Sequence, residues 1–290
     1  MKNSAVMRAC EEMMKKGSAS FYSAFQHLDY PKREGVFVIY AFCRMIDDSV
    51  DEPEQSPYTL SELKDQFTHL EFASGHFIWP SLRWLFKEFP LTKEPFYKQM
   101  QGQASDLTFT KYTSLEELDV YCEQVAGSVG QMLLPVLHNQ PTKEIEEAGI
   151  YLGKAMQIVN IIRDVGEDQE RSRRYIPKQL MDKHGYSDSA FSHGVIDANF
   201  TSMINELMNL ADRWFLKGMT KLETYPEKSA FCIQLAAGYY AAIMEQVVLN
   251  NYQVYTKRAI VTDKKKQEIF LKALTCSVKE ASCSVVSREA

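Results

Sequence analysis

The sequence predicts an all-α protein folded as one helical domain over residues 1–290. Apolar residues recur at i, i+3 and i+4 spacing through long segments, and no segment shows the alternation typical of a half-buried strand. Prolines separate these segments and mark the ends of helices. Because the sequence has no Gly/Ser-rich linker, repeat or low-complexity tract, one large domain explains its length better than two.

The expected helices follow the chain in order. Pro31 suits the first turn of a helix that continues through the apolar run VFVIYAF. The sequences from Thr59 to Glu62 and from Ser114 to Glu117 have the pattern of capping boxes and predict the starts of two more helices. Long helices are then expected at about 91–110, 114–139, 142–168, 199–224, 227–256 and 263–285.

Several of these segments are apolar around much of their circumference yet contain isolated polar residues. They are 31–50, 114–139, 142–168 and 227–256. A helix that is apolar all round is normally buried, and buried polar groups need partners or line a cavity. We therefore expect a central apolar cavity. Gly127 and Gly130 are interpreted as points of close helix packing, with close approach of the backbone to a substrate as the alternative.

Composition and charge exclude several classes of function. The net charge of −5 provides no basic field for nucleic acid. No run of 18 apolar residues predicts a membrane span, and the N-terminal sequence with Glu11 and Glu12 does not have the pattern of a signal peptide. The six cysteines form no CxxC pair and the six histidines no HExxH motif. We therefore expect reduced core thiols, no His-based metal site and a cytoplasmic location.

Two pairs of aspartates have a spacing of four residues, and no other Asp–Asp pair in the sequence shares it. Asp47 and Asp51 end one long apolar segment, and Asp164 and Asp168 end another. Residues four apart lie on the same face of an α-helix, so each pair is predicted to point in one direction. Asp48 points about 100° away from the first pair.

Each pair has an arginine close by, Arg44 before the first and Arg163 before the second. Carboxylates that lie together repel one another and are costly to bury without a partner. Mg²⁺ resolves this repulsion, because it binds oxygen ligands and is commonly shared between carboxylates and a substrate phosphate. Arginines suit the phosphate oxygens. Spacing alone leaves open the alternative that both pairs are helix-end charges on a solvated surface.

These residues belong to longer stretches that are similar to a known family. The stretches are YAFCRMIDDSVD (40–51), YCEQVAGSVGQMLLPVL (121–137) and LGKAMQIVNIIRDVGEDQERSRRYIP (152–177), with a weaker match from Tyr240 to Arg258. In their order and spacing the chain resembles the squalene/phytoene synthase family, the head-to-head isoprenyl diphosphate synthases. In length it is most similar to small bacterial dehydrosqualene synthase-like members.

The resemblance implies a single all-α isoprenoid synthase domain, a helical bundle around a central apolar cavity. It implies that Mg²⁺ ions join the four aspartates, Asp47, Asp51, Asp164 and Asp168, to the diphosphate of farnesyl diphosphate. The residues that it implies for binding the substrate are Lys16, Ser18, Ser20, Phe21, Tyr40, Arg44, Gln157, Asn160, Arg163, Arg171, Arg173, Tyr240 and Arg258.

The sequence departs from the pattern of the family at two places. Near the N-terminus, Gly17 and Ala19 stand where similar members carry His and Lys in a His-Ser-Lys-Ser-Phe type stretch. After the YC pair at 121–122, Glu123 and Gln124 stand where the family has a tyrosine that faces the diphosphate. A carboxylate there would repel a diphosphate unless it is metal-bound or protonated.

These departures lead to a hypothesis about the product. Coupling two prenyl units needs precise placement of both, whereas ionising one needs only the metal site. We therefore expect a farnesyl diphosphate diphosphatase, in which water captures the allylic cation to give farnesol. Head-to-head coupling to a C30 product is the alternative. Under the hydrolytic hypothesis, Glu123 is a candidate for acting on the attacking water.

A third class is a non-catalytic descendant that binds a lipid or a partner, and the four intact aspartates argue against it.

The lysines at 264–266 are interpreted as a solvated face, with peripheral contact to an anionic membrane as the alternative. The sequence leaves the oligomeric state open.

Overall fold

Helices account for 72% of the chain, and the described residues contain no β-strand, which confirms the predicted all-α class. The computed structural model describes residues 4–108 and 111–275. Its helices are α1 (Ala5–Gly17), α2 (Ala19–Phe25), α3 (Lys32–Asp51), α4 (Leu60–Thr68), α5 (Ile78–Glu88), α6 (Glu94–Ser105), α7 (Leu115–Cys122), α8 (Ser128–Leu137), α9 (Lys143–Arg163), α10 (Val165–Glu170), α11 (Lys178–Lys183), α12 (Asp188–Ser192), α13 (Ala198–Met219), α14 (Glu227–Leu249) and α15 (Asp263–Thr275).

The predicted helix starts agree closely with the structure. Pro31 is the N-cap of α3, one position before its first helical residue. Thr59 and Ser114 form complete capping boxes, in which each hydroxyl accepts from the N3 backbone N–H and the N3 glutamate accepts in return. These local signals depend on neighbouring residues alone, which is why the sequence is sufficient to place them.

Several predicted long helices are interrupted or shorter than expected. The segment 114–139 contains α7, a π-helical turn (Glu123–Gly127) and α8. The segment 142–168 breaks at Asp164, which ends α9 and precedes α10. The segment 227–256 ends its helix at Leu249, since Asn251 has a positive φ. In the segment 263–285, α15 covers the described residues from Asp263 to Thr275, and the remainder lies outside them.

The break at Asp164 has a tertiary cause. The backbone N–H of Gly166 donates to the carbonyl of Val254 at 3.2 Å. A Cβ on Gly166 would lie 2.2 Å from the carbonyl oxygen of Tyr255, so the chain after α14 rests directly on the start of α10. A contact between segments so far apart in sequence is invisible to helical periodicity.

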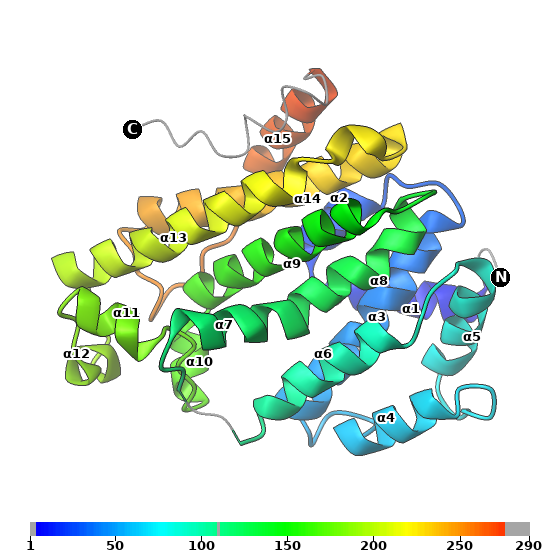
Figure 1. The fold of residues 1–290 in the computed structure, drawn as a ribbon, viewed down its shortest axis with the longest axis horizontal. Coiled ribbons are helices and arrows are strands. Elements are labelled where there is room, and N and C mark those ends of the chain that lie inside the picture. The colour runs from blue at the N-terminus through cyan, green and yellow to red at the C-terminus, as the bar shows by residue number, and fades with distance from the viewer. Residues whose placement is uncertain (1–3, 109–110, 276–290) are drawn as a thin grey trace.

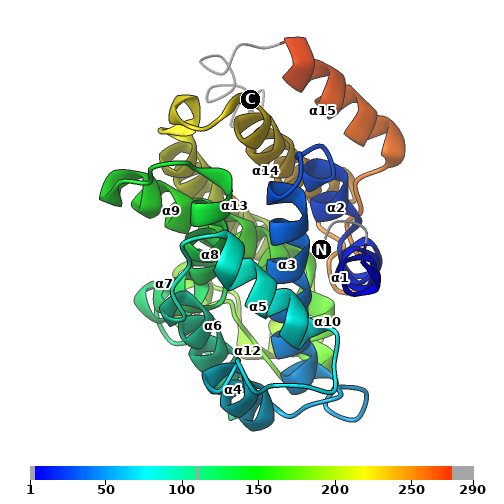
Figure 2. The same ribbon diagram turned by 90° about the vertical axis from the view of Figure 1, so that its right-hand side faces the viewer.

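The long helices α3, α8, α9 and α14 lie around a common centre, with α13 along α9 (Figure 1). Helix α2 packs on α14 and α1, and α1 packs on α3, which closes the ring. Figure 2 shows α15 at the outside of the bundle, beside α14. The N-terminal helices thus cover one side of a space whose other walls come from the middle and end of the chain.

Helix α14 is long and apolar enough, by length and composition, to cross a membrane, and it is the one such helix in the described part of the chain. Of its most apolar window, 67% is buried inside the structure. It packs against α2, α9 and α15, so burial in the bundle accounts for its apolar surface. The predicted core thiols are confirmed at Cys10, Cys43, Cys122 and Cys232, which are buried and free; Cys276 and Cys283 lie outside the described residues.

Candidate active site

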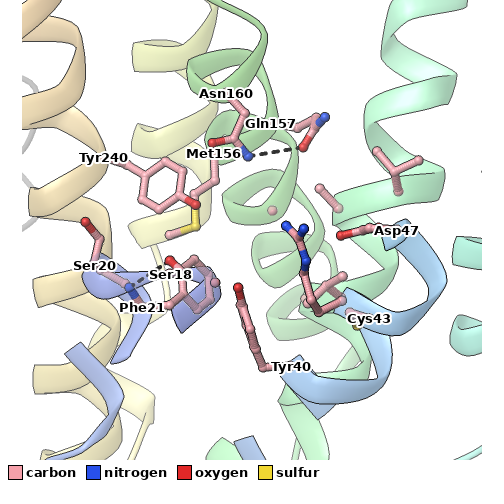
Figure 3. A pocket seen from close by; sticks show the side chains of 18 of the residues that line it. Ser18, Ser20, Phe21, Tyr40, Cys43, Asp47, Met156, Gln157, Asn160 and Tyr240 are labelled. Carbon is pink, nitrogen blue, oxygen red and sulfur yellow. Dashed lines mark hydrogen bonds between the residues drawn. The ribbon is translucent and has the colours of Figure 1, made fainter. Parts of the chain in front are cut away.

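The expected central cavity is present, with a volume of about 630 Å³, within the range of small-molecule sites. Its walls come from α2, α3, α8, α9 and α14, and from the segment 258–261. Figure 3 shows Tyr40 and Asp47 of α3, and Gln157 and Asn160 of α9, facing this space. Aspartates and arginines line one part of the cavity, which we call the mouth, and aliphatic side chains line the rest, the interior.

The first acidic pair behaves as helix geometry predicts. Asp47 and Asp51 both line the mouth from the last turns of α3. Asp48 is directed elsewhere, and its Oδ1 lies 2.5 Å from the guanidinium of Arg44. The Asp47 carboxylate accepts a hydrogen bond at 2.5 Å from Nε2 of Gln103, a residue of α6.

The second pair lies across the break between α9 and α10. Asp164 lines the mouth and pairs with the neighbouring Arg163, whose Nε donates at 2.7 Å. Arg258 lies 3.3 Å from Asp164 and 2.9 Å from Glu167. The backbone N–H of Asp168 still donates to the carbonyl of Asp164 at 2.9 Å, but the Asp168 side chain lies outside the cavity lining. The same sequence spacing therefore produces a less regular face here than in α3.

Two arginines that follow the second pair reach across to the first. Arg171 and Arg173 donate to the two oxygens of Asp51 at 3.1 and 2.6 Å. Ser172, between them, has a φ of +60°, a conformation unusual for a residue with a side chain, and it turns the chain so that both arginines point to one carboxylate. This contact brings together the two motifs that the sequence separates by more than a hundred residues.

Burial and mutual repulsion act on the carboxylates of the mouth. Burial, together with the nearby acids Asp51 and Asp48, raises the pKa of Asp47 to about 8 against the opposing effect of Arg44. Burial likewise raises the pKa of Asp168 to about 8, helped by the negative charges of Asp164 and Asp51. Carboxylates in such surroundings favour any cation that compensates their charge.

The donor set fits magnesium in its chemistry. The aspartates of the two motifs supply only oxygen ligands, which Mg²⁺ prefers. In the described residues, no three His, Cys, Asp or Glu side chains are gathered as metal ligands, and arginines contact Asp51 and Asp164. The aspartates are thus compatible with the ion, and arginine side chains compensate part of their charge in this structure.

Most residues that the resemblance implies for substrate binding surround this cavity. Ser18, Ser20, Phe21, Tyr40, Arg44, Gln157, Asn160, Arg163, Arg171, Tyr240 and Arg258 all line it. Arg173 and Lys16 do not; Arg173 contacts the mouth through Asp51, and Lys16 is exposed on α1. The roles of these residues remain predictions, but their placement is what such roles require.

The two departures from the family pattern differ in their position. Gly17 and Ala19 line the cavity, and a Cβ on Gly17 would lie 2.4 Å from the hydroxyl of Tyr40, which occupies the space beside it. Glu123 and Gln124 do not line the cavity, and Glu123 pairs with Lys98 at 2.5 Å. The expectation that Glu123 confronts the diphosphate is therefore wrong, because its carboxylate pairs with Lys98 of α6 outside the cavity lining.

The glycines of the same segment serve close packing, as predicted. A Cβ on Gly130 would lie 2.3 Å from the carbonyl oxygen of Gly149 in α9. Of the three lysines at 264–266, Lys265 pairs with Glu245 at 2.7 Å and Lys266 lines the cavity, so the segment is more than a solvated face.

Sequence reasoning missed the polar residues of α6. Gln99, Gln103 and Asp106 lie close to the first acidic pair, and Gln99 lines the cavity. Their spacing of four and three residues is a helical stripe that the sequence displays. Nothing in the sequence connects that stripe to α3, and only the tertiary contact of α6 with α3 reveals it.

The bundle has the all-α fold of the isoprenoid synthases. A solved dehydrosqualene synthase in complex with a ligand matches with a TM-score of 0.87 over 93% of this chain and 95% of that chain, at 29% identity. The family profile for squalene/phytoene synthase matches residues 14–265. This chain therefore belongs to the squalene/phytoene synthase family.

Two curated relatives are plant proteins. Chloroplastic phytoene synthase 1 of Zea mays is 29% identical over 269 residues, and a chloroplastic phytoene synthase of an Oncidium hybrid cultivar is 30% identical over 266 residues. Each alignment covers 89% of this chain and 65% of the relative, so this chain spans just under two thirds of their length.

Proposed function

We propose that this chain ionises farnesyl diphosphate and couples two of these molecules head to head to a C30 product. The observation that carries the proposal is the charged mouth, in which aspartates and arginines from both motifs converge on an apolar cavity. Membership of the squalene/phytoene synthase family supports prenyl transfer over hydrolysis. It thereby favours the coupling alternative over the diphosphatase that the sequence alone led us to expect.

The chemistry needs charge compensation where the diphosphate leaves. The C1–O bond of one allylic diphosphate breaks, and the diphosphate departs with the electron pair. When bound, Mg²⁺ held by Asp47, Asp51, Asp164 and Asp168 would neutralise that departing charge. Arg171 and Arg258 bind carboxylates in this structure and line the same cavity, so they are placed to exchange carboxylate for phosphate oxygens.

The interior of the cavity protects the cation left behind. Its wall includes Val129, Leu133, Ile233 and Ile243, and such a surface holds a prenyl chain and excludes water. The double bond of the second prenyl chain then bonds to C1, and loss of a proton closes a cyclopropane in a C30 diphosphate. Capture by water would instead add a hydroxyl and release a proton, giving farnesol.

Hydrolysis is retained as a second candidate because of one observation. Gly17 and Ala19 line the mouth where similar sequences carry His and Lys, so this chain presents fewer cationic groups to a second diphosphate. A second substrate that is held less firmly leaves the cation open to water. Glu123 lies outside the cavity lining, so it gives no further support to hydrolysis.

The product decides between the candidates. Purified protein is incubated with Mg²⁺ and farnesyl diphosphate, and separately with geranylgeranyl diphosphate to test chain length, and the hexane extract is analysed by mass spectrometry. A hydrocarbon or cyclopropyl diphosphate of doubled chain length is the expected result. A prenyl alcohol as the main product would overturn coupling in favour of hydrolysis, and no turnover by folded protein would favour a binding protein.

A further inference from the structure

Helix α6 presents a row of polar side chains behind the first acidic pair. Gln99, Gln103 and Asp106 follow one another at spacings of four and three residues, which places them on one face of the helix. Gln99 and Asp106 are almost completely buried, with 2% and 6% exposure. Burying polar groups costs free energy unless they form hydrogen bonds, so the partners of this face of α6 indicate its function.

The C-terminal end of α6 is anchored firmly. Asp106 accepts hydrogen bonds at 2.9 Å from the hydroxyls of both Tyr121 and Tyr175. Tyr121 belongs to α7, and Tyr175 belongs to the loop that carries Arg173 to Asp51. The carboxylate thus joins α6 to α7 and to the arginine loop, and it fixes the position from which Gln103 extends.

The neutral side chain of Gln103 forms a hydrogen bond with a member of the first acidic pair. Its Nε2 donates to Oδ1 of Asp47 at 2.5 Å. Asp51 and Asp164 differ, since arginines contact both of them. An amide donor orients a carboxylate and adds no positive charge, whereas a guanidinium also neutralises it. Asp47 is therefore held in place and remains available to a cation.

We infer that Gln103 is a positioning residue, which orients the Asp47 carboxylate for a divalent cation and does not itself touch the substrate. The inference rests on the proposed function, in which Asp47 is a ligand of Mg²⁺. Partners that orient a ligating side chain typically change metal affinity by about 10- to 100-fold when they are removed. Removing the amide should lower the affinity for Mg²⁺ by this factor, because the Asp47 carboxylate would then have to be ordered when the ion binds.

The test uses Gln103→Met, which keeps the length of the side chain and removes the donor. Gln101→Met is the matched control, since Gln101 lies on the exposed side of the same helix. Isothermal titration of the full-length protein with Mg²⁺ in the presence of inorganic diphosphate should show affinity for Mg²⁺ lowered about 10-fold or more in Gln103→Met. The control should match the wild type, and circular dichroism should show both variants folded.

A second measurement works without metal. In metal-free buffer, Gln103→Met should shift the midpoint of unfolding in the wild-type background but much less in an Asp47→Ala background, since the acceptor is then gone. Equal Mg²⁺ affinity in Gln103→Met and wild type, or additive shifts in the unfolding cycle, would overturn the inference alone. A wild-type protein that binds no Mg²⁺ with diphosphate would overturn the proposed function, and with it the inference.

Discussion

The mouth and the interior of the cavity are held together by different forces. At the mouth, Asp51 is bound by Arg171 and Arg173, and Asp164 by Arg163 and Arg258. In the interior, helices α8 and α9 touch through backbone atoms, because glycines leave no side chain between them. The mouth depends on ion pairs that can exchange partners, whereas the interior depends on fixed distances between helices.

This difference predicts how the two regions respond to substitution. Ion pairs of half-exposed arginines such as Arg171 and Arg258 contribute little to stability, so changes to these side chains should alter turnover and leave the fold intact. Close-packed backbones tolerate no added atoms, so changes in the interior should alter stability first. The variants below test this division in order of decreasing effect.

Replacing Asp47 by Ala should nearly abolish turnover. The substitution removes one of the carboxylates proposed to hold the cation, and losses of electrostatic stabilisation of this kind cost about 10²- to 10³-fold in kcat. Because burial raises the pKa of Asp47, the folded protein disfavours its charged form, and the variant should unfold no more easily than the wild type in metal-free buffer at pH 7. Steady-state kinetics and thermal unfolding provide the measurements. Retained turnover would remove the proposed metal site, and a large loss of stability would break the division between mouth and interior.

Replacing Gly153 by Ala should mainly lower the stability of the fold. The added Cβ would lie 2.1 Å from the carbonyl oxygen of Ala126, so α9 must move away from the π-helical turn. Overpacking of this kind lowers the free energy of unfolding by about 1–3 kcal/mol. Gly149→Ala is the matched control on the same helix, because its nearest contact, the carbonyl oxygen of Gly130, would be an ordinary 3.7 Å. Denaturant unfolding of both variants checks the prediction, and equal stability of the two would contradict it.

Replacing Tyr175 by Phe should both lower the stability of the fold and raise KM. The substitution removes one of two hydroxyls that donate to the buried Asp106, and an unsatisfied buried acceptor costs about 1–3 kcal/mol. Tyr121→Phe removes the other hydroxyl and should cost a similar amount. Tyr175 also lies two residues after Arg173, so its substitution alone should raise KM for the diphosphate severalfold. A KM that rises equally in both variants would show that the loop has no separate role.

The features that could be predicted from the sequence are those with local causes. The capping boxes at Thr59 and Ser114, and the shared face of Asp47 and Asp51, follow from spacing within one or two helical turns. The break at Asp164 depends on the contact between Gly166 and the carbonyl of Tyr255, far away in the chain, and was missed.

The orientation of Glu123 was missed for a similar reason. The expectation for Glu123 rested on the place of a tyrosine in the family pattern, which does not show what packs beside this position. Lys98 of α6 supplies a partner that the sequence does not identify. The role of Gln103 belongs to the same class, since it rests on the packing of α6 against α3.

Replacing Glu123 by Gln should have the smallest effect of this series. Glu123 lies outside the cavity lining and its side chain is 39% exposed in a pair with Lys98, so the pair contributes at most about 1 kcal/mol. The ratio of prenyl alcohol to coupled product should therefore change less than about twofold, in line with that small contribution. Mass spectrometry of the extracted products, with Lys98→Met as the control that breaks the same pair from α6, measures the ratio. If Glu123→Gln alone removed the alcohol, Glu123 would act on water after all, and the π-helical turn would belong to the mouth.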